Sequence, residues 1–319
     1  MTRDLQPPVL CLIVPCFNED ETVLPTANRL KDTLDALIRE RRVSPDSRIL
    51  FVDDGSSDRT WDELRRIAVP GSIYSAISLS RNFGHQNALL AGLMAARSFC
   101  QVSISLDADL QDDPSVIPGM LESFSRGNDI VYAVRRNRSS DSFPKRASAA
   151  FFYRLIRLLG VRLIPDAGDF RLMSRRAMDA LALYPEHNPF LRGLVPLLGF
   201  SSGCVYFDRK PRLTGRSKYT VRRMGAFALD GLLSLSLFPL FLILPAGFIL
   251  LAASVFLFSA DVSSPRLTAA AVCFAGAAIT CSLGILALYA GKIYTELLNR
   301  PRYIVKETLN FPVYSLDRM

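Results

Sequence analysis

The sequence predicts an α/β fold with a mainly parallel sheet, followed by two helices that cross a membrane. Three features of the 319-residue chain carry this prediction: apolar runs that alternate with helical patterns, polar clusters after the apolar runs, and two long uncharged segments near the C-terminus. Alternating strands and helices favour a sheet with helices on both faces. Ligands of such sheets bind beyond the carboxyl ends of the strands.

Five apolar runs predict the strands of this sheet, at 9–15, 49–58, 74–80, 102–109 and 129–136, and the second of them runs into a turn. The helical patterns between them cover 21–41, 61–67, 86–97 and 114–126. A polar cluster ends each strand, in chain order NED, DDGSSD, RNFGHQ, DADLQDD and RRNR. Because the carboxyl ends of parallel strands meet at one edge of the sheet, the five clusters predict a shared ligand site.

The fourth strand ends in the most acidic of these clusters, with four aspartates within 107–113. One interpretation is a solvated loop with a helix N-cap at Asp112 or Asp113. The other is a metal site, since crowded carboxylates repel one another unless a cation lies among them. The chain has neither a G-x-G-x-x-G after its first strand nor a P-loop, so a phosphate ligand would need a metal and basic side chains. Carboxylates such as Asp107 and Asp109 suit Mg²⁺ or Mn²⁺.

The segments 232–260 and 267–291 carry no charge, and each is long enough to cross a bilayer, which needs about 20 apolar residues. A pair of buried core helices is the alternative. Seven Lys or Arg lie in 209–223 and four more follow the second segment, whereas the connector 261–266 holds one acid and one base. The positive-inside rule therefore predicts a multi-pass protein of the inner or plasma membrane, with both termini cytoplasmic.

These features predict four regions along the chain. They are a cytoplasmic domain at 1–209, a basic juxtamembrane segment at 210–231, two spans with a short external hairpin at 232–291, and a cytoplasmic tail at 292–319. The net charge of +8 does not favour nucleic acid, because the bases cluster beside the spans and no nucleic-acid-binding motif is present. Six cysteines without a C-x-x-C pair indicate a reducing compartment, and two histidines exclude a multi-histidine metal site.

A series of motifs resembles the membrane-anchored family-two glycosyltransferases that charge polyprenyl phosphates, the group of dolichol-phosphate mannosyltransferases and bactoprenol glucosyltransferases. The motifs, in order, are IVPCFNE, VDDGSSD, LSRNFGHQNAL, DADLQDDP, VYAVRRNR, GDFRLMSR, RSKYT and GKIYTELLNRPRYIV. The resemblance implies a GT-A fold and inverting hexose transfer from a nucleotide sugar to a polyprenyl phosphate, supplying lipid-linked sugar for the cell envelope. It also implies Mg²⁺ or Mn²⁺ and a homo-oligomer.

The resemblance also implies roles for individual residues. It assigns nucleotide-sugar binding to Pro15, Asn18, Glu19, Asp53, Asp54 and Asp107. It assigns the metal to Asp109 and Gln111, and catalysis to Asp169 with Asp107 and Arg171. It assigns the acceptor phosphate to Arg135, Arg216 and Lys218, of which the last two lie about a dozen residues before the first predicted span.

The chemistry of the implied reaction agrees with this residue set. A metal stabilises the charge of a diphosphate leaving group by several kcal/mol. The acceptor phosphate is already anionic near neutral pH, so it needs positioning by cations more than deprotonation. Asp169 is therefore expected to orient or steer rather than to act as a strong base. Each of these residues also has a possible structural role. Asp53 and Asp58 could accept hydrogen bonds that stabilise a turn around Gly55, and His85 could form a hydrogen bond at the start of a helix. Asp169 could form an ion pair with Arg171.

UDP-glucose and undecaprenyl phosphate are the expected substrates, because GDFRLM resembles the glucosyltransferase branch. A UDP-aminoarabinose derivative, UDP-galactose and GDP-mannose stay open as donors. A phosphatase that uses D-x-D as nucleophile is disfavoured, because its motif follows the first strand and this one follows the fourth. A non-enzymatic lipid transporter or scaffold is also disfavoured, since two spans offer no transport path and a scaffold needs no polar strand ends.

Overall fold

The computed structural model describes residues 6–109, 111–136, 164–187, 189–208, 240, 243–259 and 265–311. Arg216, Lys218 and the whole juxtamembrane segment lie outside these ranges. The chain divides into two compact units, which we describe separately. The first comprises Met1–Arg154, Arg162–Lys218 and Pro301–Met319, and the second comprises Leu155–Val161 and Tyr219–Arg300.

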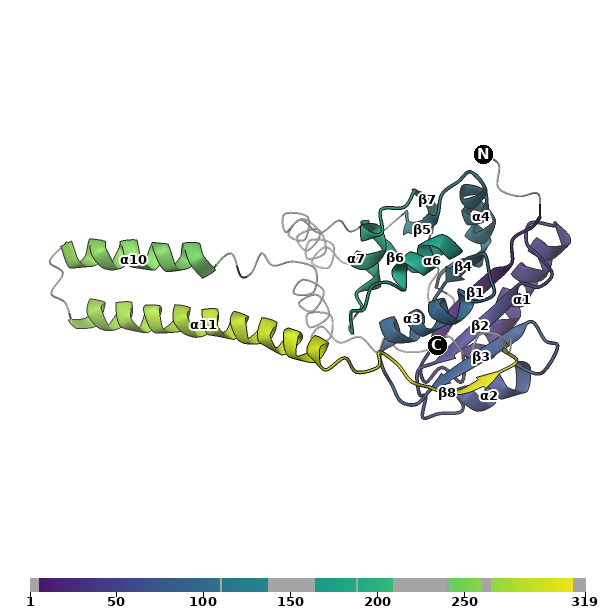
Figure 1. Cartoon of the computed structure of the whole chain (residues 1–319), viewed down its shortest axis with the longest axis horizontal. Coiled ribbons are helices and arrows are strands. Elements are labelled where there is room, and N and C mark those ends of the chain that lie inside the picture. Colours follow the sequence, from purple (N-terminus) through teal and green to yellow (C-terminus); the bar gives the residue numbers. More distant parts are fainter. Residues whose placement is uncertain are drawn as a thin grey trace. The chain divides into compact units, whose positions relative to one another are not determined.

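The first unit is built on one eight-stranded sheet, with strand order β7-β5-β6-β4-β1-β2-β3-β8 (Figure 1). The strands are β1 (Leu10–Cys16), β2 (Arg48–Asp53), β3 (Tyr74–Leu79), β4 (Val102–Ser105), β5 (Ile130–Arg135), β6 (Ala167–Ser174), β7 (Ser202–Phe207) and β8 (Val305–Leu309). The helices are α1 (Val23–Arg39), α2 (Thr60–Ile67), α3 (His85–Ala96), α4 (Ile117–Ser125), α6 (Arg175–Leu181) and α7 (Leu191–Leu197), with a 3₁₀ turn at Pro114–Val116.

All five predicted strands form and point the same way, and β7 points with them, whereas β6 and β8 run antiparallel, so the sheet is mixed. β1 runs parallel to β2 and β4, and β2 runs parallel to β3. β6, which the sequence analysis did not anticipate, runs antiparallel between β4 and β5. Because β4 and β5 are both antiparallel to β6, their carboxyl ends lie at the same edge of the sheet. The start of β6 lies at that edge too, and so brings Asp169 there.

β2 runs into a turn as predicted, whereas β4 ends earlier than its predicted range. β2 ends at Asp53, because the next turn passes through Gly55 with φ of 66°. A Cβ at Gly55 would come within 2.4 Å of the backbone of Arg81, so only glycine fits there. β4 ends at Ser105, so Asp107 and Asp109 stand beyond the sheet rather than on a strand. Their carboxylates are thereby placed at the ligand edge.

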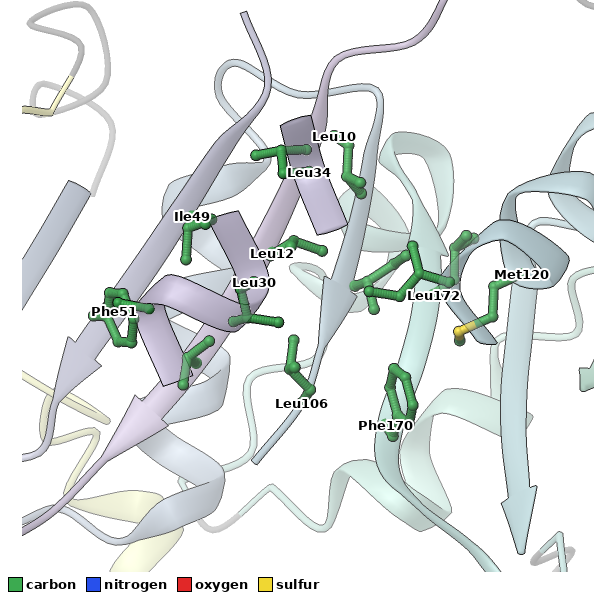
Figure 2. Close-up of a cluster of buried hydrophobic side chains, with 14 of the residues drawn as sticks. Leu10, Leu12, Leu30, Leu34, Ile49, Phe51, Leu106, Met120, Phe170 and Leu172 are labelled. Atoms are coloured by element: carbon green, nitrogen blue, oxygen red, sulfur yellow. The ribbon is translucent and has the colours of Figure 1, made fainter. Parts of the chain in front are cut away.

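The hydrophobic core lies between the sheet and α1, with α4 covering the neighbouring strands. α1 buries one stripe at helical spacing, comprising Val23, Thr26, Ala27, Leu30, Leu34 and Leu37. Figure 2 shows Leu30 and Leu34 of α1 among Leu10, Leu12, Ile49 and Phe51 of β1 and β2. α3 packs on β1 and β2, where a Cβ at Gly92 would lie 2.4 Å from the Ile13 side chain. This close packing holds the start of α3 firmly at the ligand edge.

The segment that follows the second predicted span returns to the sheet. β8 pairs antiparallel with β3, although the sequence analysis expected only a tail at 292–319. Glu307 on β8 accepts hydrogen bonds from Trp61 Nε1 at 3.2 Å and from Arg65 Nη2 at 2.8 Å on α2. Just after β8, Asn310 Nδ2 donates to the carbonyl of Tyr74 at 2.7 Å. β8 is therefore an integral part of the sheet.

The second unit holds two apolar helices, α10 (Ile243–Ser259) and α11 (Pro265–Leu297), which lie side by side (Figure 1). Within α11, Thr268–Leu297 is long and apolar enough to cross a membrane, with mean hydropathy of 2.2. This helix contains nearly all of the second predicted span. α10 covers 17 residues of the first predicted span, and much of the remainder lies outside the described residues. Among the described residues, one helix rather than two therefore meets the length needed to span.

Candidate active site

The loops after β1 and β2 are fastened to each other at the ligand edge. Asn18 takes a φ of 55°, a left-handed conformation that asparagine tolerates. Its Oδ1 accepts from the Ser57 amide at 2.8 Å, and the Glu19 amide donates to Thr60 Oγ1 at 2.8 Å. Pro15 is buried one residue before the end of β1. Pro15, Asn18 and Glu19 thus lie at the carboxyl end of β1, and their contact with a nucleoside stays a prediction.

Asp53 and Asp54 are both buried and both hold neighbouring segments. Asp53 Oδ2 accepts from Ser78 Oγ at 3.1 Å on the adjacent strand. The two oxygens of Asp54 accept from the amides of Phe83 at 2.7 Å and Gly84 at 2.9 Å. Burial raises the pKa of Asp54, and the two amide hydrogen bonds oppose that rise. The Asp54 carboxylate therefore fixes the loop that leads into α3, and its predicted contact with a base stays a prediction.

The D-x-D motif stands directly beyond β4. Asp107 and Asp109 are half-buried, and Asp109 Oδ1 accepts from the backbone N–H of Gln111 at 3.1 Å. Carboxylate and amide oxygens are hard ligands that suit Mg²⁺ or Mn²⁺ beside substrate phosphates. Among the described residues, no group of three or more His, Cys, Asp or Glu side chains is arranged so that it could by itself hold a metal ion. Asp113 caps the following turn by accepting from the Ser115 amide at 3.2 Å, as the N-cap interpretation expected.

Asp169 is the centre of a cluster of donors from two helices, α3 and α7. It lies near the start of β6, where the ladder pairs Arg171 with Ser105 of β4. Arg192, in the first turn of α7, donates to both of its oxygens, from Nε at 3.2 Å and from Nη2 at 2.9 Å. His85 Nε2 and Gln86 Nε2, in the first turn of α3, each lie 3.2 Å from Oδ2. The fold thus surrounds one buried carboxylate with cationic and amide donors.

The charges in this cluster set its protonation states. Burial alone would raise the pKa of Asp169, but Arg192 and His85 outweigh it and hold that pKa well below its usual range. Burial alone would lower the pKa of His85, but the hydrogen bond to Asp169 and the charge of Asp107 raise it to about 9. Near neutral pH, Asp169 is therefore a carboxylate and His85 is protonated. Asp169 is a weak proton acceptor in this arrangement.

Arg171 is fully buried on the same strand, two residues beyond Asp169. Its Nε, Nη1 and Nη2 make no hydrogen bond, and its guanidinium lies over the Tyr132 ring at 5.9 Å from the centroid. Burial lowers the pKa of this guanidinium, while the charge of Asp169 raises it. The sequence alternative of an Asp169–Arg171 pair is not what the structure shows, because the hydrogen bonds of the Asp169 carboxylate come from α3 and α7.

Arg135 reaches the same edge from the end of β5, with Nη2 3.9 Å from Asp112 Oδ1. The other two predicted phosphate ligands, Arg216 and Lys218, lie outside the described residues. Sequence reasoning missed Arg192 and Gln86. Gln86 stood in a polar cluster that was noted, whereas Arg192 lies in the motif-free stretch NPFLRG and gave no signal.

Comparison with known proteins identifies the family. The family described as Glycosyl transferase family 2 matches residues 11–182. Among similar proteins, the uncharacterized glycosyltransferase YkoT of Bacillus subtilis (strain 168) is 41% identical over 93% of this chain and 91% of that relative. The SfII prophage-derived bactoprenol glucosyl transferase of Shigella flexneri is 34% identical over 94% of this chain and 98% of that relative.

Solved structures share the fold at low identity. Mannosyltransferase PcManGT from Pyrobaculum calidifontis, in complex with GDP-Man and Mn²⁺, aligns with a TM-score of 0.51 and 17% identity over 92% of this chain and 86% of that one. Glucosyl-3-phosphoglycerate synthase from Mycobacterium tuberculosis aligns with a TM-score of 0.50 and 19% identity over 72% and 80%. The chain therefore belongs to glycosyl transferase family 2 and is a glycosyltransferase with the GT-A fold.

Proposed function

We propose that this chain transfers glucose from UDP-glucose to undecaprenyl phosphate, with inversion, at the cytoplasmic face of the membrane. The observation that carries the proposal is the similarity to bactoprenol glucosyl transferases, which extends over 94% of the chain and includes the apolar C-terminal segment. A donor site at the edge of the sheet and an apolar anchor suit a reaction whose acceptor stays in the bilayer. The product would be a lipid-linked sugar for envelope glycans.

On the donor side, the loops after β1, β2 and β4 frame the nucleotide sugar. We assign Asn18, Glu19 and Asp53 to the nucleoside, and Asp107 to the sugar. Asp109 and Gln111 would hold Mg²⁺ or Mn²⁺ against the diphosphate. A divalent cation bound there would stabilise the charge that develops on the leaving diphosphate. The Mn²⁺ complex of the solved mannosyltransferase with this fold supports the proposal of a metal.

On the acceptor side, the attacking atom is a phosphate oxygen that already carries negative charge. The enzyme therefore has to hold and aim the acceptor more than it has to remove a proton. The low pKa of Asp169 supports this, because a carboxylate that binds protons weakly makes a poor general base. We assign Asp169 and Arg171 to orientation at the reaction centre, and Arg135, Arg216 and Lys218 to the acceptor phosphate.

The pairing of β8 with β3 supports a hairpin through the membrane. Residues 305–309 belong to the same sheet as β7, which ends at Phe207, so both segments lie on one side of the membrane. The chain between them must cross an even number of times. If α11 crosses once, a second crossing is required, and 232–260 is the uncharged segment available for it. The basic flanks put the sheet on the cytoplasmic side.

A transfer assay with purified full-length protein tests the function. Radiolabelled UDP-glucose, UDP-galactose, a UDP-aminoarabinose derivative and GDP-mannose are each incubated with undecaprenyl phosphate and Mn²⁺ in detergent. Label from UDP-glucose should enter the organic phase only when lipid phosphate is present. Preferential transfer from another donor would correct the sugar, and absence of transfer from all four would reject the function. Native mass spectrometry of the same sample tests the predicted homo-oligomer.

A further inference from the structure

The donors around Asp169 form a receptor for an anion, and in this structure the anion is the protein's own carboxylate. Arg192 donates one hydrogen bond to each carboxylate oxygen of Asp169. A guanidinium group binds carboxylates and phosphates with this same two-bond geometry. His85 and Gln86 supply further donors to one of these oxygens. A phosphate monoester offers the same oxygen pattern with more charge, so it can compete for these donors.

Arg171 adds donor capacity that this arrangement leaves unused. Its guanidinium is buried, and none of its three nitrogens makes a hydrogen bond. Buried donors without partners are costly, and a charged one more so than a neutral one. Arg171 and Asp169 face the same side of β6, since they are two residues apart on a strand. Arg171 is therefore a cation near the Asp169 carboxylate whose hydrogen-bond donors are still available.

The two partners of the Asp169–Arg192 pair differ in their access to solvent. The side chain of Asp169 is 3% exposed, whereas that of Arg192 is 41% exposed. The side chains of His85 and Asp107, which lie 3.7 Å apart beside the pair, are about one third exposed. A ligand that approaches the sheet edge therefore meets Arg192 before it meets Asp169. Arg192 can turn toward the ligand while Asp169 stays in place.

We propose that Asp169 is an internal substitute for the acceptor phosphate. Arg192 binds Asp169 in the substrate-free chain and passes to the acceptor phosphate when the lipid arrives, while Arg171 and His85 retain Asp169. Arg192 would then be a binding residue for the acceptor, and Asp169 would tune the affinity of the site. This inference rests on the proposed function, since it takes a phosphate monoester as the acceptor.

Calorimetric titration of full-length protein in detergent with decyl phosphate tests the inference, with saturating UDP and Mn²⁺ present to fill the donor site. Asp169→Asn removes the internal competitor, so decyl phosphate should bind about tenfold more tightly, equivalent to ~1.4 kcal/mol. Arg192→Gln should weaken its binding by a similar factor. Unchanged or weaker binding by Asp169→Asn, in protein that still binds UDP normally, would overturn the inference.

Loss of negative charge alone could also tighten phosphate binding, and a double-mutant cycle separates this effect from competition. In the Arg192→Gln background, Asp169→Asn should lose most of its effect, because no Arg192 remains to be released. A tightening that persists undiminished in that background would show simple repulsion and overturn the inference. Asp129→Asn and Arg176→Gln, which alter an equivalent pair elsewhere, should leave decyl phosphate binding unchanged.

Two further binding measurements distinguish the acceptor phosphate from the donor diphosphate as the ligand of this cluster. Decyl phosphate should bind while UDP is present, and UDP affinity should be the same in the Arg192→Gln variant and in the wild type. Competition between decyl phosphate and UDP would assign the cluster to the donor diphosphate and overturn the inference. A further outcome is that the wild type transfers glucose to undecaprenyl phosphate while Asp169→Asn binds decyl phosphate no better than the wild type does. That combination of results would support the proposed function and reject only this inference.

Discussion

Each of the two edges of the sheet holds a buried aspartate paired with a more exposed arginine, and the two pairs have different roles. At the amino edge of the sheet, Asp129 and Arg176 approach to 2.8 Å, with side chains 2% and 69% exposed. At the carboxyl edge, Asp169 and Arg192 approach to 2.9 Å, with side chains 3% and 41% exposed. By distance and burial of the carboxylate, the pairs are nearly the same.

Their surroundings distinguish them. Asp129 also accepts a hydrogen bond from the hydroxyl of Ser174 at 2.8 Å. This bond from a neutral donor connects the start of β5 to the end of β6. Asp169 instead meets His85 and Gln86, and the charges of Asp107 and Arg171 lie close by. Ionisable groups with shifted pKa values are concentrated at functional sites. The additional charges around Asp169 therefore indicate a functional pair, whereas the neutral surroundings of Asp129 indicate a structural one.

The largest effect is expected at the carboxyl edge. Asp109→Ala should reduce glucosyl transfer roughly a thousandfold, because it removes a ligand of the metal that offsets the diphosphate charge. Excess chelator should have the same effect on the wild type. Radiolabel transfer measures the activity, and thermal unfolding should show a midpoint near that of the wild type. Full turnover in chelator would contradict the metal assignment.

The amino edge should respond in stability instead. Asp129→Ala removes hydrogen bonds to Ser174 and Arg176 and should cost about 2 kcal/mol of unfolding free energy. The thermal midpoint should then fall by about 5 °C. The KM for donor and the KM for acceptor should stay at wild-type values. A selective change in either KM, without loss of stability, would break the comparison between the two edges.

A smaller effect is expected in the basic segment at 210–231. Lys218→Ala should raise the KM for lipid phosphate about fivefold, the equivalent of ~1 kcal/mol for one charged contact. The affinity for UDP should be unchanged. Lys210→Ala is the matched control, since it removes a base from the same flank outside the RSKY motif. Equal effects of the two variants would make Lys218 a topology signal only.

The smallest effect is a dependence of stability on pH. The pKa of His85 is about 9 in the folded chain and 6.5 in the unfolded chain, so the folded state binds the proton more tightly. Its contribution is complete below pH 6.5 and is lost as the pH rises through about 9. Thermal unfolding across this range should show a smaller decline for His85→Gln than for the wild type. Parallel curves would contradict the assigned protonation.

The sequence predicted those parts of the fold that depend on local pattern. The strands β1 to β5 and the helices α1 to α4 have clear periodicity, and the five polar clusters after the strands together predict the ligand edge. β6 and β8 were not predicted, because their places depend on pairing with strands distant in the sequence. Arg192 could not be predicted for the same reason: only the packing of α7 near β6 brings it to Asp169.

The place of β8 at the end of the chain has a consequence for biosynthesis. Translation delivers β3 more than two hundred residues before its partner strand, with the apolar helices in between. Until residues 305–309 leave the ribosome, the outer edge of β3 has no strand to pair with, and open edges invite pairing with other chains. Completion of the sheet therefore follows synthesis of α10 and α11. A chain truncated ahead of β8 keeps an unprotected edge and is prone to aggregate.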